Sequence, residues 1–188
     1  MTKRRYGKAD WIDLGLQELA AHGSEAVKLE AICKAAKLTR GSFYHHFEDH
    51  EAFLTGLAEH WLARQTTDVA DLIDPNDTPI VQYVALNEAA MGIDYRLELG
   101  IRELARRLPA IDRIIKQADA VRLDVVRTLY QRRYGIEEDL AEGLAIIEYA
   151  AFSGIILLDP DISLERQRSL AKLHEDMMRR ALGQENAQ

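Results

Sequence analysis

Residue types that mark secreted or metal-binding proteins are scarce in this sequence. It contains one cysteine, Cys33, among 188 residues, which excludes an internal disulfide and leaves a metal cluster without enough thiol ligands. No apolar run follows Met1, so we expect no secretory signal. Together these absences favour a reducing, cytoplasmic location.

Long hydrophobic runs are also missing. The longest apolar stretch, residues 144–158, is interrupted by Glu148 and is shorter than the roughly 20 residues that span a bilayer. We interpret this stretch as a buried helix and expect no membrane partner.

Patterns that carry catalysis are not found in the sequence. There is no phosphate-binding loop, no cluster of metal ligands and no nucleophile spaced to meet a base. We therefore predict no enzyme activity, no catalytic residues, no metal and no cofactor. An enzyme that uses Glu98, Asp119 or His174 as acid–base groups is the alternative that the composition leaves open.

Positive charge is in deficit overall, but it is unevenly distributed. The net charge is −7, yet residues 1–47 hold eight lysines and arginines against five aspartates and glutamates. The remaining residues hold sixteen basic against twenty-six acidic side chains. A basic N-terminal segment on an acidic body predicts that only this segment approaches a polyanion such as DNA, because phosphates repel the rest.

Helical periodicity dominates the chain and strand alternation is nearly absent, so the predicted fold is all-α. Gly23 and Gly135 are placed to end helices, while Thr39 and Ser163 are placed to begin them. The prolines within residues 74–79 exclude a continuous helix there. The expected helices cover about residues 9–22, 28–36, 40–47, 49–73, 80–91, 95–107, 109–134, 138–158 and 163–182.

Residues 29–47, LEAICKAAKLTRGSFYHHF, carry the most specific pattern in the sequence. Two short helices are separated by a three-residue break, and Phe43 and Phe47, four residues apart, share the inward face of the second helix. The opposite face is small, polar and rich in hydrogen-bond donors. Such a helix fits the major groove of DNA, with its N-terminal residues at the base edges.

The exposed residues of this segment are chemically suited to contact DNA. Arg40 can form two hydrogen bonds with guanine, and Gly41, which has no side chain, lets the helix backbone approach DNA closely. Positively charged side chains outside this helix can pair with phosphates. The predicted DNA-binding residues are Lys3, Arg4, Arg5, Lys28, Lys37, Thr39, Arg40, Gly41, Ser42, Tyr44, His45, His46 and His50. Two alternatives stay open, because His46 can serve packing at a helix end and residues 3–5 can be a solubilising tail.

The same segment resembles the DNA-binding domain of the tetracycline-repressor (TetR) family of bacterial regulators. The resemblance covers roughly residues 6–60 and depends most on the TRGSFYHHF core. The remaining two-thirds of the chain agrees with the family only in length and helical content. The matching residues are Ile32, Ala35, Ala36, Leu38, Thr39, Gly41, Phe43, Tyr44, His46, Phe47, Phe53 and Leu54.

The resemblance implies two domains. The first is a three-helix helix-turn-helix DNA-binding domain at residues 1–48, and the second is a helical ligand-binding and dimerisation domain at residues 49–188 that begins with a connecting helix over about Asp49–Ile73. The resemblance also implies a homodimer formed by the last two long helices, which binds a palindromic operator in double-stranded DNA. A small-molecule effector would release the operator, with repression of transcription as the outcome, and the residues that bind this effector are not predicted.

Two positions depart from the family pattern. The turn usually contains glycine where this chain has Lys37, and a left-handed lysine costs on the order of 1 kcal/mol, which a phosphate contact can offset. The family usually has lysine as a phosphate anchor where this chain has His50. If protonated His50 replaces that anchor, operator affinity falls as the pH rises from about 6 to 8.

Several features in the rest of the chain have two interpretations. The charges between residues 98 and 107 form either a solvated helix face or an anion-binding pocket. The apolar ridge 146–155 and the stripe 170–181 fit helix pairing between two copies, since a monomer would struggle to bury the first. A different class of function also stays open, in which the first domain does not read DNA and the acidic body binds proteins. Polar residues that either line a ligand cavity or satisfy one another in the core are Tyr83, Asn87, Glu148 and Tyr149.

Overall fold

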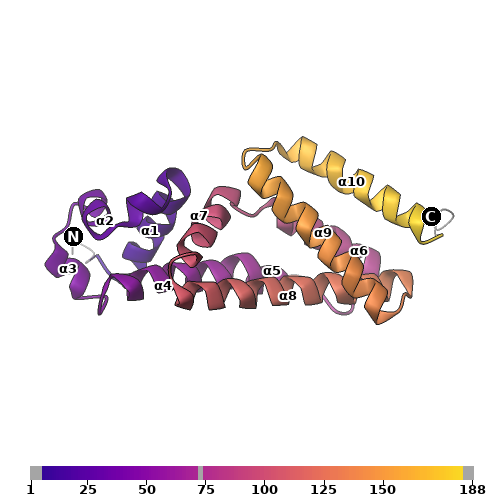
Figure 1. Ribbon diagram of the computed structural model, residues 1–188, viewed down its shortest axis with the longest axis horizontal. Coiled ribbons are helices and arrows are strands. Elements are labelled where there is room, and N and C mark those ends of the chain that lie inside the picture. The colour runs from indigo at the N-terminus through magenta and orange to yellow at the C-terminus, as the bar shows by residue number, and fades with distance from the viewer. Residues whose placement is uncertain (1–5, 72–73, 184–188) are drawn as a thin grey trace. The chain divides into compact units, whose positions relative to one another are not determined.

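The computed structural model describes residues 6–71 and 74–183, and no strand occurs in these ranges (Figure 1). The chain divides into two compact units. Unit 1 comprises residues 1–68 and 94–121, and unit 2 comprises residues 69–93 and 122–188. The all-helical prediction is confirmed, whereas the functional boundary at residue 48 stays a prediction.

Unit 1 is built from the N-terminal helices and from a return of the chain after residue 93. Its elements are α1 (Lys8–His22), a 3-10 turn (Ser24–Val27), α2 (Leu29–Ala36), α3 (Arg40–Tyr44), α4 (His50–Leu62), a π-helical turn (Ala63–Thr67), α7 (Tyr95–Ala105) and the first half of α8 (Pro109–Tyr134). Unit 2 contains α6 (Pro79–Met91), the second half of α8, α9 (Glu138–Leu158) and α10 (Leu164–Ala181). The short α5 (Asp68–Asp71) follows the π-helical turn.

Local signals in the sequence fix most helix ends. The hydroxyls of Thr39 and Ser163 accept hydrogen bonds from backbone amides of the first turns of α3 and α10, as predicted. Gly23 and Gly135 have φ values of 76° and 64°, which suits glycine after a helix. Helix α3 ends at Tyr44, three residues before the predicted end, and the 3-10 and π-helical turns are elements that periodicity did not predict.

An aromatic core holds α1, α3 and α4 together in unit 1. Trp11 and Phe43 are fully buried and meet edge to face, with ring centroids 5.4 Å apart. Phe43 also meets Phe53 of α4 at 5.3 Å. Gly15 permits the close approach of α1 to α4, because a Cβ there would lie 2.7 Å from side-chain atoms of Phe53 and Leu57. These three helices therefore pack as one body. We call α1, α2 and α3 together the head.

Helix α7 packs directly on the head through α1. A Cβ at Gly100 would lie 2.7 Å from Cγ of Leu19, so the absence of a side chain at residue 100 lets the two helices touch. A polar contact supports the same packing, because the hydroxyl of Ser24 donates to Oε1 of Glu103 at 2.9 Å. The head is thus tied to α7 as well as to α4.

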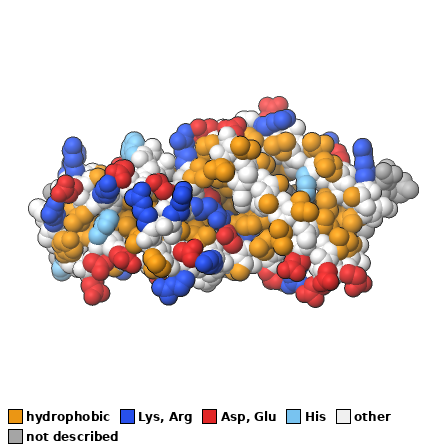
Figure 2. Space-filling model, in the orientation of Figure 1, with side chains coloured by type: hydrophobic (Ala, Val, Ile, Leu, Met, Phe, Trp, Pro, Cys, Tyr) orange, Lys and Arg blue, Asp and Glu red, His pale blue; other side chains and the backbone are white. Residues whose placement is uncertain are grey.

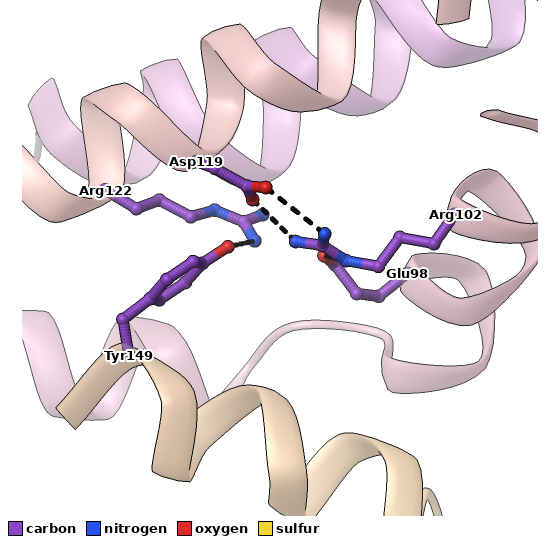
Figure 3. Close-up of polar contacts among 5 residues, drawn as sticks. All are labelled: Glu98, Arg102, Asp119, Arg122 and Tyr149. Atoms are coloured by element: carbon purple, nitrogen blue, oxygen red, sulfur yellow. Dashed lines mark hydrogen bonds and ion pairs between the residues drawn. The ribbon is translucent and has the colours of Figure 1, made fainter. Parts of the chain in front are cut away.

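A buried carboxylate in unit 1 corrects one sequence interpretation. Glu98 is 1% exposed, although the charges between residues 98 and 107 are typical of a solvated helix face. Arg102 compensates the burial, because its Nε donates to Glu98 at 2.8 Å and its two Nη atoms donate to Asp119 at 2.6 and 3.3 Å (Figure 3). Paired and hydrogen-bonded in this way, Glu98 and Asp119 are explained as a structural ion-pair network between α7 and α8.

Unit 2 has a polar and aromatic interior. The phenols of Tyr83 and Tyr130 both donate to the carboxylate of Glu148, which lies on α9. The pKa of both phenols is raised well above the usual range, mainly by burial and secondly by the charge of Glu148. Both hydroxyls therefore stay protonated and act as donors. Tyr149 accepts a hydrogen bond from Arg122 at 3.3 Å (Figure 3). The polar residues that the sequence left open are thus hydrogen-bonded to neighbours within the unit.

Helix α9 is apolar but mostly uncovered within a single chain. By length and composition it is the one described helix that could cross a membrane. Only 17% of its most apolar 18-residue window is buried within the chain. The prediction of a buried helix is therefore wrong for the isolated chain. Hydrophobic side chains lie open over α9 and α10 (Figure 2), with Ile147 62% and Leu158 85% exposed. An exposed apolar surface of this kind is typical of a contact with another protein or with a membrane.

Candidate nucleic-acid interface

The backbone between α2 and α3 forms a tight turn around a left-handed lysine. Lys37 has φ 54° and ψ 37° and is the one non-glycine residue with positive φ in the described part of the chain. The amide of Leu38 donates to the carbonyl of Cys33 at 3.0 Å, which closes the end of α2. The conformation that favours glycine is therefore present, and lysine adopts it at a modest cost.

Helix α3 is short, and one side of it is anchored in the core of unit 1. Phe43 is fully buried, and Phe47, just beyond the helix, is 3% exposed. Their ring centroids lie 5.0 Å apart, and the ammonium of Lys8 lies 5.5 Å from the ring centroid of Phe47. With only five residues, α3 depends on these aromatic contacts rather than on its own hydrogen bonds.

The opposite side of α3 presents the predicted residues to solvent. Arg40, Gly41, Tyr44 and His45 are exposed, and Ser42 is half-buried. Tyr44 packs its ring edge to face against Phe43 at 5.5 Å, so its position is set by the core. The structure thus gathers these five residues on one small helix surface that carries hydroxyl, imidazole and guanidinium donors.

Gly41 has no structural reason to be glycine within the protein. A Cβ there would meet only Oγ1 of Thr39, at an ordinary contact distance of 3.7 Å. Its φ does not lie in the left-handed range. An alanine would therefore fit the folded chain, and the bare backbone is available to a partner that approaches α3 closely.

The remaining predicted residues surround α3 to different degrees. Lys28 and Lys37 are exposed near the two ends of α2, Thr39 is exposed at the start of α3, and His46 is half-buried beyond its end. The rings of His45 and His46 lie 5.0 Å apart. Lys3, Arg4 and Arg5 lie outside the described residues.

Two acidic residues, which the sequence reasoning missed, lie beside these cations. Glu25 pairs with Lys28 at 2.5 Å, and Glu30 pairs with Arg40 across the turn. All four side chains are largely exposed, so each pair is weak and easily exchanged for another partner. The spacing of three residues between Glu25 and Lys28 was a readable signal, whereas the pair of Glu30 with Arg40 needed the fold.

His50 lies at the first turn of α4 with one ring nitrogen already engaged. Its Nε2 lies 2.8 Å from the carbonyl oxygen of Val27, and since a carbonyl only accepts, Nε2 donates. The ring also faces Phe43 and Phe53, with centroids 6.4 and 6.1 Å away. His50 thus links the start of α4 to the residue just before Lys28, and a phosphate contact would have to use the other ring nitrogen.

Taken together, the exposed residues around α3 offer many hydrogen-bond donors. Among residues 6–71 and 74–183, no group of three metal-ligating side chains is close enough to hold an ion. Cys33 is buried on α2, and burial, opposed in part by the charge of Arg40, raises the pKa of its thiol. The arrangement is suited to hydrogen-bonding and ion-pairing with a polyanion.

The sequence of this region matches a known protein family. The family model described as bacterial regulatory proteins, tetR family, matches residues 12–57, which include most of α1, all of α2 and α3, and most of α4. Among curated proteins, none matches this chain.

Solved structures of bacterial regulators share the fold. A TetR transcriptional regulator from Legionella pneumophila has a TM-score of 0.76 at 15% identity, covering 95% of this chain and 99% of its own. Regulatory protein TetR from Rhodobacter sphaeroides has a TM-score of 0.67 at 19% identity, covering 90% and 97%. The reduced form of Escherichia coli NemR has a TM-score of 0.68 at 18% identity, covering 88% and 95%.

Proposed function

We propose that this chain, whose residues 12–57 match the tetR-family model, is a bacterial regulator of that family and binds a specific DNA operator to control transcription. The observation that carries the proposal is the exposed, donor-rich face of α3 on a rigid aromatic anchor. In the proposed complex α3 enters the major groove, Arg40 reads guanine and Gly41 admits the DNA backbone. The phosphates are contacted by Lys28, Lys37, His46 and His50.

We further propose that the protein works as a homodimer in the cytoplasm. The exposed apolar surface of α9 and α10 supports this, because a second copy of the same surface would cover it. Two copies of α3 would then enter successive major grooves about 34 Å apart on a palindromic site. Glu142 and Glu148 within α9 disfavour a bilayer as the cover, and Glu148 is already bound by two tyrosines.

The dimer is tested by light scattering during gel filtration without detergent. We expect the wild type to elute as a dimer and Ile147→Glu to shift it toward monomer, because a carboxylate would be buried at the contact. Val84→Glu, on an exposed apolar position of α6, is the matched control and should stay dimeric. A wild-type protein that needs detergent to stay in solution would contradict this use of α9.

The direction of control is proposed as repression that a small molecule relieves. The match of residues 12–57 to the tetR-family model supports this proposal. An effector would bind within the C-terminal helices and change the spacing of the two α3 helices. We propose no catalytic activity, since Glu98 and Asp119, two acid–base candidates of the sequence, share the guanidinium of Arg102.

The decisive experiment selects bound fragments from random duplex DNA and titrates salt on the winner. We expect a short palindrome bound at nanomolar affinity with a steep salt dependence. Arg40→Ala should lose the sequence preference, by about 1–3 kcal/mol, while remaining a folded dimer. Arg106→Ala, an exposed arginine of the same unit away from α3, should behave as the wild type. Weak binding without a consensus would refute the proposal.

A further inference from the structure

The guanidinium of Arg40 is held by a residue of the helix that precedes α3. Its Nη2 donates to Oε1 of Glu30, the second residue of α2, across the turn that contains Lys37. The charge of Arg40 also reaches the thiol of Cys33 on α2, where it opposes the larger rise of the pKa that burial causes. Two observations therefore place the side chain of Arg40 along α2.

The contact with Glu30 leaves most of the guanidinium available to a second partner. An arginine carries five N–H donors in a planar fork, and Glu30 accepts from Nη2. The donors that remain suffice for the O6 and N7 acceptors that guanine presents in the major groove. Arg40 can therefore bind guanine while it keeps Glu30, and the carboxylate fixes where the guanidinium lies.

A phosphate is a poorer partner for an arginine that is held in this way. A phosphate oxygen on the same guanidinium would lie close to the carboxylate of Glu30, and two negative charges at short range repel each other. Breaking the ion pair first would leave Glu30 unpaired on a surface that faces a polyanion. The ion pair is therefore compatible with guanine and unfavourable wherever Arg40 contacts the DNA backbone instead.

The strength of this ion pair depends on the access of water. In the free protein the side chains of Arg40 and Glu30 are 59% and 81% exposed, so the pair is weak. Bound DNA would cover this surface, and the same two charges would interact more strongly in the lower local dielectric. The effect of Glu30 is thus expected as a difference between DNA sequences rather than in the stability of the free protein.

We propose that Glu30 is a positioning residue for Arg40, through which the protein selects guanine at the position that Arg40 reads. Glu30 keeps the guanidinium in place for guanine and disfavours phosphate as its partner. The inference rests on the proposed function, because it assigns the source of base preference within the same interface. It adds a residue whose charge weakens the attraction to DNA as a whole and sharpens the choice of sequence.

The test repeats the selection from random duplex DNA with the full-length wild type and with Arg40→Ala, which identifies the guanine that Arg40 reads. The readout is the ratio of the affinities for the selected operator and for the same duplex with adenine in place of that guanine. For Glu30→Gln we expect the affinity for the altered duplex to rise more than that for the operator, so that the ratio falls about threefold to fivefold.

The matched control is Glu25→Gln, which removes the same charge from the exposed pair with Lys28. It should raise the affinity for both duplexes alike and leave the ratio unchanged, because it does not touch Arg40. Glu25 and Glu30 are both exposed, so each variant keeps the fold.

The double variant Glu30→Gln/Arg40→Ala shows whether Glu30 acts through Arg40. In the Arg40→Ala background, Glu30→Gln should raise both affinities alike and leave the ratio as it is in Arg40→Ala. An unchanged ratio in Glu30→Gln, an equal fall in Glu25→Gln, or a further change of the ratio in the double variant would each overturn this inference alone. Absence of a consensus for the wild type would overturn the proposed function and this inference with it.

Discussion

Replacing Gly100 by alanine perturbs the contact that holds the head on α7. A Cβ at residue 100 would lie 2.7 Å from Cγ of Leu19 and 2.9 Å from its Cδ1. Because Cγ is the branch point of a side chain that is 1% exposed, Leu19 cannot swing away without moving α1. Overpacking of this kind costs about 1–3 kcal/mol, and the higher helix propensity of alanine returns about 0.5–1 kcal/mol. We expect the free energy of unfolding to fall by about 0.5–2 kcal/mol.

Urea unfolding followed by tryptophan fluorescence measures this loss where it occurs, because Trp11 and Trp61 are the two tryptophans and both are buried in unit 1. Gly41→Ala is the control, since that position has space, and it should unfold at the same or a slightly higher urea concentration. Adding Leu19→Ala to Gly100→Ala removes the clash. The double variant should therefore lose at least about 1 kcal/mol less than the sum of the single losses. Additive losses, or a fully stable Gly100→Ala protein, would refute the close contact of α1 with α7.

Three other predictions concern the surface of α3 and the helix beside it. Gly41→Ala should weaken binding to a selected operator at least about tenfold without lowering stability, and unchanged binding would show that the backbone there stays away from DNA. Glu30→Gln frees Arg40 and removes a negative charge, so DNA affinity at low salt should rise about twofold to fivefold and the gain should shrink at high salt; equal affinities would count against the ion pair. The raised pKa of the Cys33 thiol leaves little thiolate near pH 7, so a thiol reagent should react slowly until urea unfolds the protein. Fast labelling of the native protein would contradict the burial of Cys33.

Local chemistry explains why the helices could be predicted from the sequence. Thr39 and Ser163 begin helices through their own hydroxyls, and Gly135 ends one by adopting positive φ, so each boundary depends on residues close in sequence. The inward anchoring of α3 was predictable for the same reason, since Phe43 and Phe47 lie four residues apart. The TRGSFYHHF core indicates the family by itself, because its nine residues are contiguous and need no long-range contact to be read.

Long-range partners explain why other features could not be predicted. Glu98 lies four residues before Arg102, a spacing that is typical of an ion pair on a solvated helix surface. In the fold Arg102 pairs with the buried Glu98 and also with Asp119 on another helix, a contact that spacing within one helix does not predict. The pair of Glu30 with Arg40 crosses the turn between two helices, so spacing within one helix could not predict it. For α9, composition predicted burial, but only 17% of its apolar window is buried by the described residues of the chain.

The packing of α1 on α7 limits how regulators of this kind can be recombined. A chimera that joins a foreign DNA-reading segment to this body after residue 48 would place an unrelated side chain against Gly100, and it would remove the donor that Glu103 receives from Ser24. A larger residue would collide there and a smaller one would leave a void. A workable exchange must therefore carry α7 with the incoming segment or redesign positions 19 and 100 as a pair. The set of residues that must be exchanged together is accordingly larger than residues 1–48, because it includes the part of α7 that contacts Leu19 and Ser24.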